Sequence, residues 1–270
     1  MTQAWVGEVE KISAEYNIPL EDLPLILGDP KVLPMIRGKA LEHNAARILR
    51  NILPSEIWEV NKLFLNPQLG AHDIDIEIIH KPTKKFIRVE CKLAKKEGFR
   101  SYSYKSYVEI EVKCMRSRTL GDKKVKELAP KWGVSENQLK IHNDQYLGTE
   151  FDFILTSIGN AFYRTEESSG KYIWDPTPEE EVFLQELLGV DKQQLRDVAY
   201  RRMYIARVKD VIVSKSNDVK CSRKKCENPD NCGFIPNYPI IKFDKLTKQP
   251  VNGWVPIERC VDLFNEFVNG

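Results

Sequence analysis

The residues of this chain whose types and spacing could do chemistry lie in two short acidic stretches. Asp73 and Asp75 alternate with apolar residues in the first stretch, and Glu90 and Lys92 alternate with apolar residues in the second. This period-two alternation predicts two half-buried strands, and the polar stretch 80–85 between them predicts a turn. A hairpin of this kind gathers the carboxylates and the lysine on one face. Such a face can hold a divalent cation beside an activated water molecule.

The register of this hairpin follows from its turn. A four-residue turn with Pro82 at its second position places Asp75 opposite Glu90. Two carboxylates that face each other across a strand pair are destabilising unless a cation lies between them, which predicts a hard ion such as Mg²⁺. A slip of one hairpin position places Asp73 opposite Glu90 instead, so both aspartates are candidates. The alternative interpretation is an ordinary surface hairpin whose charges face solvent.

Upstream of the hairpin, residues 38–50 have the apolar spacing of a helix and carry Glu42, and residues 57–60 form a short strand-like run. A helix with a glutamate, a strand with an aspartate and a strand with Glu-x-Lys, in that order, resemble the PD-(D/E)XK nuclease superfamily, and type II restriction endonucleases most of all. The resemblance covers roughly residues 35–120, and its most telling run is Val-Glu-Cys-Lys-Leu. The residue before Asp75 is isoleucine where the family name has proline, which leaves the choice between the two aspartates open.

The resemblance implies an α/β fold in which helices flank a mixed central β-sheet, and Mg²⁺-dependent, sequence-specific cleavage of double-stranded DNA. It implies that Asp75, Glu90 and the carbonyl oxygen of Cys91 bind Mg²⁺. Lys92 would then orient or deprotonate the attacking water and stabilise charge on the phosphate. Glu42 would contact the metal through water or a second ion, and a solvated helix residue is its alternative interpretation. Family members leave 5′-phosphate ends, and cleavage of both strands at palindromic sites usually calls for a two-fold homodimer.

The charge of the chain is uneven although its net value is only +2. Residues 81–126 hold fifteen basic and five acidic residues, and residues 192–225 hold eleven and three. Basic blocks next to the acidic hairpin suit a phosphate backbone, and a plain solvated surface is the alternative. We expect contacts with double-stranded DNA from Arg100, Lys105, Arg116, Arg118, Arg201 and Arg202.

The chain is expected to divide into a nuclease core with N-terminal helices, residues 1–165, and a helical, cysteine-containing C-terminal extension, residues 166–270, that packs on the core and contributes DNA contacts. Alternating or apolar runs predict strands, and helical spacing with caps predicts helices. The strands are expected over 108–112 and 151–158, and the helices over 123–132, 178–188 and 192–207.

Three cysteines of the extension, Cys221, Cys226 and Cys232, lie within a dozen residues in a loop that contains Gly, Pro and Asn. Such a cluster suggests a structural Zn²⁺ site, although the spacings are looser than a Cys-x2-Cys knuckle. Chance clustering of reduced thiols is the alternative. The candidates for a fourth ligand, each of which must fold back onto the loop, are Cys260, His142 and His80.

Composition excludes some classes of protein. No apolar run reaches the ~20 residues that a membrane-spanning helix needs, and the N-terminus lacks the pattern of a signal peptide. We therefore expect no membrane partner, a cytoplasmic location and reduced thiols. Two other functions fit the same residues: a structure-specific or repair nuclease of the same superfamily, and a DNA-binding protein without catalysis in which the acidic hairpin is only a surface.

Overall fold

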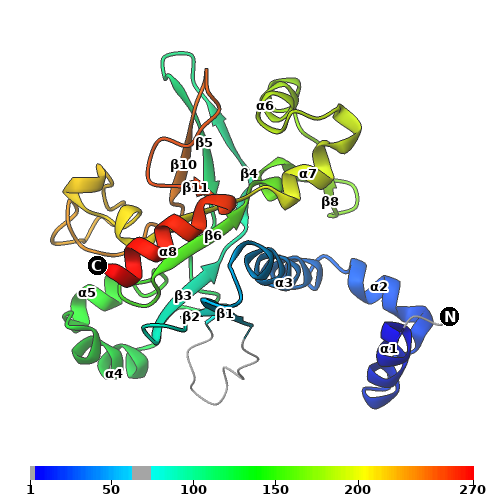
Figure 1. Cartoon of the computed structure of the whole chain (residues 1–270), viewed down its shortest axis with the longest axis horizontal. Coiled ribbons are helices and arrows are strands. Elements are labelled where there is room, and N and C mark those ends of the chain that lie inside the picture. Colours follow the sequence, from blue (N-terminus) through cyan, green and yellow to red (C-terminus); the bar gives the residue numbers. More distant parts are fainter. Residues whose placement is uncertain (1–3, 63–73) are drawn as a thin grey trace.

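A six-stranded mixed sheet forms the centre of the computed structural model, which describes residues 4–62 and 74–270 (Figure 1). Its strand order is β1-β2-β3-β6-β9-β11, in which β3 and β6 are parallel and the other neighbours are antiparallel. The strands are β1 (Trp58–Asn61), β2 (Ile76–His80), β3 (Lys85–Cys91), β6 (Phe153–Ser157), β9 (Met203–Arg207) and β11 (Val255–Pro256). The mixed central sheet predicted from the sequence is therefore present, and the apolar strand β6 lies near its middle, as its composition predicts.

Two helices, α3 (Leu33–Ile52) and α8 (Cys260–Asn269), cover one face of this sheet. Leu41, Ala45 and Leu49 of α3 recur at helical spacing and are buried. They share one core with Phe264 of α8 and with the residues of β2 and β3 that point to this face. The helix predicted over residues 38–50 is confirmed, and it begins earlier because Pro34 occupies its first turn.

The other face of the central sheet packs against a second sheet and two helices. This sheet has the order β10-β5-β4, and α6 and α7 lie beside it (Figure 1). Its strands are β4 (Ala94–Ser101), β5 (Tyr107–Val112) and β10 (Ile240–Asp244), and the helices are α6 (Pro178–Leu188) and α7 (Leu195–Arg201). The central sheet is therefore covered on both sides, and this explains why β6 is buried along its whole length.

The remaining elements lie at the periphery. Helices α1 (Ala4–Glu15) and α2 (Leu23–Gly28) extend away from the body of the molecule at its N-terminal end (Figure 1). Helices α4 (Asp122–Trp132) and α5 (Glu136–Ile141) form a third, smaller core with the segment that carries Phe234. Strands β7 (Tyr163–Thr165) and β8 (Tyr172–Trp174) form a short hairpin of their own.

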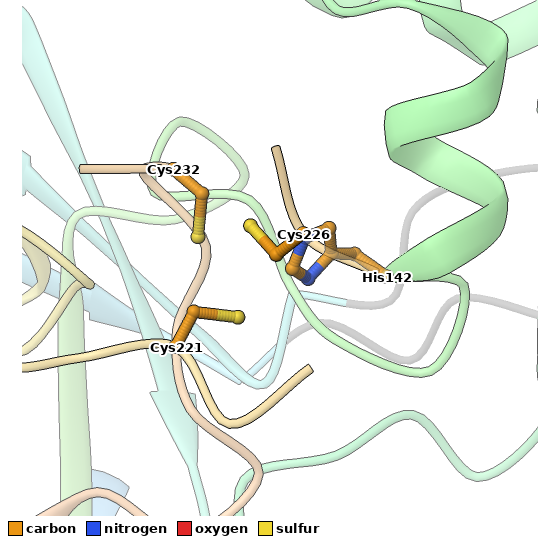
Figure 2. Close-up of side chains that lie close together, drawn as sticks. All are labelled: His142, Cys221, Cys226 and Cys232. Atoms are coloured by element: carbon orange, nitrogen blue, oxygen red, sulfur yellow. The ribbon is translucent and has the colours of Figure 1, made fainter. Parts of the chain in front are cut away.

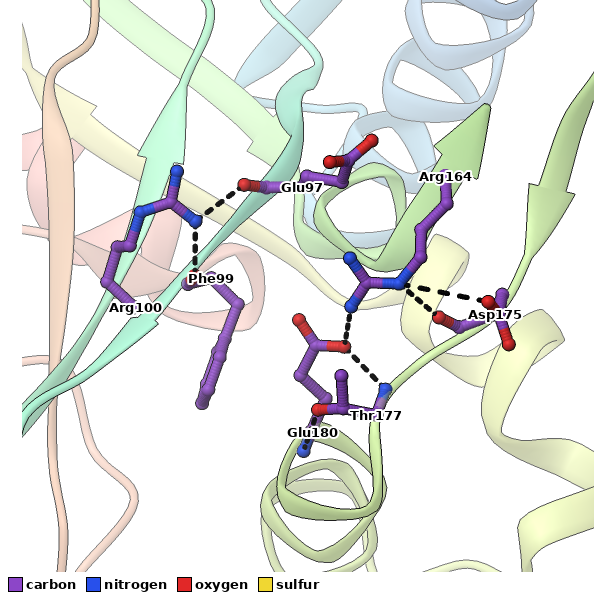
Figure 3. A network of polar contacts seen from close by, with 7 residues as sticks. All are labelled: Glu97, Phe99, Arg100, Arg164, Asp175, Thr177 and Glu180. Atoms are coloured by element: carbon purple, nitrogen blue, oxygen red, sulfur yellow. Dashed lines mark hydrogen bonds and ion pairs between the residues drawn. The ribbon is translucent and has the colours of Figure 1, made fainter. Parts of the chain in front are cut away.

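The cap of α6 agrees with its sequence signals. Thr177 and Glu180 form a reciprocal capping box: the Glu180 backbone N–H donates to the Thr177 hydroxyl (3.3 Å), and the Thr177 N–H donates to the Glu180 carboxylate (2.7 Å). Arg164 of β7 donates to the same carboxylate at 2.7 Å, and this hydrogen bond links the β7–β8 hairpin to the start of α6 (Figure 3). The helix ends at Gly189, whose φ of 65° suits a residue without a side chain.

The helix predicted over residues 192–207 is wrong in its second half. After α7 the backbone extends at Arg202, and Met203–Arg207 form β9, hydrogen-bonded to β6. A short apolar run cannot be assigned to helix or strand by periodicity alone, and pairing within the sheet decides it here. Strands β9 and β11 both follow residue 165, so this part of the chain completes the central sheet.

The β2–β3 hairpin has the predicted register. Its four-residue turn contains Pro82, and Ile76 pairs with Val89 while Glu77 pairs with Arg88. Continued by one residue, this register places Asp75 opposite Glu90. The cross-strand position fixes only the backbone, however, because the Arg88 side chain forms an ion pair with Asp152.

That ion pair joins the β2–β3 hairpin to Asp152, the residue that directly precedes β6. The Asp152 carboxylate accepts hydrogen bonds from the Arg88 backbone N–H (2.8 Å), its Nε (3.1 Å) and its Nη2 (2.9 Å). The Asp152 N–H in turn donates to the Arg88 carbonyl at 2.9 Å. This contact holds β3 in position two residues before Glu90.

Replacing Asp152 with alanine should therefore destabilise the whole sheet. We expect Asp152→Ala to lower the free energy of unfolding by about 1–3 kcal/mol, because three donors of Arg88 lose a charged acceptor. Asp197→Ala is the matched control, since the Asp197 side chain is 67% exposed and forms an ion pair with its neighbour Arg196; its effect should stay within about 0.5 kcal/mol. Urea unfolding of both variants measures the difference, and equal stabilities would contradict the role given to Asp152.

Candidate active site and metal cluster

The two carboxylates predicted to face each other are both buried at one end of the β2–β3 hairpin. Asp75 directly precedes β2 and is 6% exposed, and Glu90 lies in β3 and is 8% exposed. Asp75 Oδ2 accepts a hydrogen bond from the Cys91 backbone N–H at 2.8 Å, which fixes its carboxylate against the neighbouring strand. The register places Asp75 opposite Glu90, and the negative charge of Glu90 contributes to raising the pKa of Asp75, so the two residues lie near enough to interact. Asp73 lies outside the described residues.

Lys92 lies beside Glu90, as its spacing of two residues predicts. Its Nζ is 2.5 Å from Glu90 Oε1 and donates to the Tyr146 hydroxyl at 3.1 Å. Burial alone lowers the pKa of Lys92, but the Glu90 carboxylate and Tyr146 raise that pKa well above its ordinary value. Lys92 is therefore held as an ammonium group that points at the acidic end of the hairpin.

Glu42 of α3 is also buried, which excludes the solvated interpretation of this residue. Its Oε2 lies 2.7 Å from Lys62 Nζ and 2.9 Å from Lys39 Nζ. Burial raises the pKa of Glu42, but the hydrogen bonds from the two lysines outweigh it and the net pKa is lowered. Glu42 is thus a stable carboxylate, and it is near enough to Asp75 to affect the pKa of that residue.

The acidic group is short of positive charge at Asp75. Burial, followed by the negative charges of Glu90 and Glu42, raises the pKa of Asp75 to about 8, although the Cys91 N–H and Lys92 act in the opposite direction. A carboxylate in this condition gains from a proton or from a divalent cation. Carboxylate and carbonyl oxygens are also the ligands that Mg²⁺ prefers. The side chains present at this end of the hairpin therefore fit a hard divalent ion.

Two of the basic residues predicted to contact DNA are paired within the second sheet. The Arg100 guanidinium donates to the carbonyl oxygens of Glu97 and Phe99, each at 2.7 Å (Figure 3). Lys105, in the turn of the β4–β5 hairpin, has its Nζ 2.6 Å from Oε1 of Glu109, the residue that pairs with Arg100 across the strands. Their positive charges are thus partly compensated by carbonyl and carboxylate oxygens of the protein itself.

The other four residues differ in exposure. Arg116 is mostly buried, forms an ion pair with Glu150, and lies 4.5 Å from the centre of the Tyr146 ring, so it has a structural role. Arg202 lies 3.6 Å from a Glu258 oxygen and is half-buried. Arg118 and Arg201 are the two that are exposed. The contacts of all six residues with DNA remain a prediction.

The three cysteines of the C-terminal part of the chain converge with His142, which follows α5 (Figure 2). One potential ligand atom from each of the four residues lies within 4.8 Å of the others, so the cluster could hold a metal ion such as Zn²⁺. Of the other two candidates for a fourth ligand, Cys260 is the buried first residue of α8, and His80 contacts Thr83 and the Trp58 ring. In the ranges 4–62 and 74–270, the four residues shown in Figure 2 are the one set of at least three His, Cys, Asp or Glu side chains gathered this closely.

Sequence reasoning missed three side chains that shape the site: Lys62, Tyr146 and Asp152. Lys62 and Tyr146 contact Glu42 and Lys92 only because the fold brings distant segments together. A single cation or a single tyrosine carries no periodic signal in the sequence. One signal in the sequence could have identified Asp152: it is a polar residue just before an apolar strand, and such a residue needs a partner if it is buried.

The comparisons with known proteins do not add to these observations. No family model matches the chain, and neither a curated protein nor a solved structure matches it. Among the described helices, none is both long enough and apolar enough to cross a bilayer. The function is therefore argued from the geometry of the site.

The raised pKa of Asp75 makes stability depend on pH when no divalent ion is bound. The folded protein keeps this proton up to about pH 8, whereas the unfolded chain, in which the pKa of Asp75 has its ordinary value of 3.8, loses it earlier. The free energy of unfolding should therefore fall as pH rises between these values. The slope contributed by Asp75 is at most about 1.4 kcal/mol per pH unit.

Asp75→Asn should remove this contribution, so the variant should gain stability relative to the wild type between pH 5 and about pH 8. Urea unfolding of both proteins in Mg²⁺-free buffer at several pH values measures it. Parallel curves for the two proteins would mean that Asp75 ionises normally.

Proposed function

We propose that this protein is a Mg²⁺-dependent deoxyribonuclease that cleaves double-stranded DNA at specific sequences, as type II restriction endonucleases do, and leaves 5′-phosphate ends. The observation that carries the proposal is the buried group at the end of the β2–β3 hairpin, in which the Asp75 and Glu90 carboxylates lie beside the Lys92 ammonium. A surface hairpin with solvated charges has no reason to bury these groups, because an unpaired buried charge is costly.

In this proposal the Asp75 and Glu90 carboxylates and the Cys91 carbonyl oxygen hold Mg²⁺. The raised pKa of Asp75 supports this set, because burial and the neighbouring acids leave that carboxylate in need of a cation. When bound, the ion polarises the scissile phosphate and lowers the pKa of a coordinated water. The ionised Glu42 adds negative charge on the side of α3.

Lys92 supplies positive charge to the phosphate in this arrangement. Its pKa is well above the ordinary value, so it remains protonated near neutral pH and acts by charge stabilisation. The Tyr146 hydroxyl accepts one of its hydrogens and thereby restricts the direction of the ammonium group. Of the two roles that the family resemblance implies for this lysine, orientation with charge stabilisation is the one its environment favours.

The DNA and the second subunit are further parts of the proposal. The exposed side chains of Arg118 and Arg201 are the best placed of the six basic residues to reach a phosphate backbone, since the others have partners within the protein. Cleavage of both strands of a palindromic site calls for two active sites related by a two-fold axis, so a homodimer is proposed on symmetry grounds.

A structure-specific or repair nuclease of the same superfamily is the second candidate. It would use the same buried group, and it would differ in producing no discrete fragments from a long DNA. A binding protein without catalysis is less well supported, because binding alone gives no reason to bury an acid whose pKa is raised to about 8.

Incubating the purified protein with phage DNA and Mg²⁺, with and without a chelator, tests the proposal. We expect discrete, chelator-sensitive fragments from the wild type. Lys92→Ala should reduce the cleavage rate by at least ~10²-fold, because one preorganised charge at the phosphate is lost, and binding measured without Mg²⁺ should persist.

Lys81→Ala is the matched control. Lys81 lies in the turn at the opposite end of the same hairpin, where its Nζ donates to the Ser55 carbonyl at 2.7 Å, so its removal should leave the cleavage rate unchanged. A smear without bands would favour the repair nuclease. Full activity of Lys92→Ala, or no cleavage by the wild type under any tested ionic condition, would contradict the proposed chemistry.

A further inference from the structure

The cluster of His142, Cys221, Cys226 and Cys232 lies apart from the acidic end of the hairpin and joins two distant segments of the chain. His142 is the residue after α5 and is completely buried, whereas the cysteines come from the loop between β9 and β10 (Figure 2). All four side chains point into one space between the segments. The cysteines are free thiols, so no disulfide explains why they converge.

The hydrogen bonds of Gln145 determine which nitrogen of His142 is available. Gln145 Nε2 donates to the Ile235 carbonyl at 3.1 Å, so its Oε1 must be the atom that accepts from His142 Nδ1. His142 therefore carries its proton on Nδ1, and its Nε2 has a free lone pair. That Nε2 is buried and has no hydrogen-bond partner among the described residues. A histidine whose second nitrogen is fixed by an acceptor is the usual arrangement of a metal ligand.

We propose that Cys221, Cys226, Cys232 and His142 Nε2 bind one structural Zn²⁺ ion. Three thiolates and one imidazole form a complete tetrahedral set, which leaves no open position for a substrate or water and is typical of a structural site. A tetrahedron with 2.3 Å Zn–S bonds has edges of about 3.8 Å, so ligand atoms that lie within 4.8 Å need only small shifts to reach it. Binding displaces three thiol protons to solvent.

The surroundings of the cluster suit the single negative charge of such a centre. The Arg223 backbone N–H donates to Cys221 Sγ at 3.4 Å. The Arg223 guanidinium forms an ion pair with Asp144, next to the loop, and Lys220, Lys224 and Lys225 flank it in the sequence. The ring of Phe234 stacks on the His142 imidazole with centres 4.2 Å apart, which fixes the plane of the ligand.

The ion would also brace the segment that reaches the candidate active site. Gln145, the partner of His142, directly precedes Tyr146, and the Tyr146 hydroxyl accepts a hydrogen bond from Lys92. Arg116 donates to the Gln145 carbonyl and lies over the Tyr146 ring, so this segment is packed as one unit. The effect on Lys92 rests on the proposed nuclease function, whereas the zinc site does not.

Metal analysis of the full-length protein, purified without chelator, tests the site. We expect one zinc per chain by elemental analysis and by native mass spectrometry. A mercurial reagent that titrates thiols should release this zinc as it reacts with the three cysteines. Co²⁺ substituted for zinc should give the intense visible absorption of a tetrahedral thiolate site. These measurements on the wild type need no variant that might fail to fold.

Variants then identify the ligands. Cys226→Ser should lower the zinc content severalfold, and Cys226 is only half-buried, so the substitution spares the core. Cys260→Ala is the matched control: Cys260 begins α8 and is buried in the core that α8 shares with α3, so the variant should retain one zinc per chain. A wild-type zinc content well below one per chain, a disulfide between any two of the three loop cysteines, or full zinc retention by Cys226→Ser would overturn the proposal.

The brace is tested separately by removing the zinc and then supplying excess Mg²⁺. Cleavage should fall and should return when zinc is restored, in both the wild type and Cys260→Ala. Unchanged cleavage by zinc-free protein would reject the link to Lys92 without contradicting the zinc site. If the zinc-loaded protein does not cleave DNA either, that result contradicts the proposed nuclease function and not the zinc site.

Discussion

Two carboxylates buried opposite each other at the end of a hairpin are the constraint on which the candidate active site depends. Like charges in this position repel, and the repulsion grows as water is excluded. In the protein it is moderated from two directions: the Cys91 N–H donates to Asp75, and Lys92 lies against Glu90. The remaining imbalance falls on Asp75, whose pKa is raised to about 8 by burial and by its acidic neighbours. A proton or a divalent cation would relieve this imbalance.

The rest of the fold holds this unfavourable group in place. The central sheet is covered by α3 and α8 on one face and by the second sheet with α6 and α7 on the other, so β3 cannot relax away from β2. The parallel pairing of β3 with β6, together with the Arg88–Asp152 contact, positions Glu90 along the strand. Lys62 and Tyr146 then hold the two outer charged groups of the site, Glu42 and Lys92.

Local signals in the sequence predicted what local chemistry determines. The register of the hairpin follows from Pro82 and the alternation of apolar residues, and the start of α6 follows from its capping box. Contacts that depend on tertiary packing were not predictable in this way. Met203 begins an apolar run two residues after α7, and this run forms a strand because it pairs with β6. Arg116 looked like a phosphate-binding residue, but it is mostly buried against Glu150.

The cysteine cluster is a second case in which local sequence did not determine contacts that depend on tertiary packing. Loop spacing predicted a metal shared by the three cysteines, but it left three candidates for the fourth ligand. The fold selects His142, because α4 and α5 pack on the loop segment that contains Phe234. Long-range packing therefore decides both sites, and local sequence supplies only part of each ligand set.

We propose that Asp75 and Glu90 jointly hold one divalent ion, and calorimetric titration of Mg²⁺ into the protein measures whether they do. We predict one site per chain in the wild type, its loss in both Asp75→Asn and Glu90→Gln, and its retention in Glu77→Gln, which alters the same hairpin face without touching the site. Unchanged Mg²⁺ affinity in either of the first two variants would contradict the account.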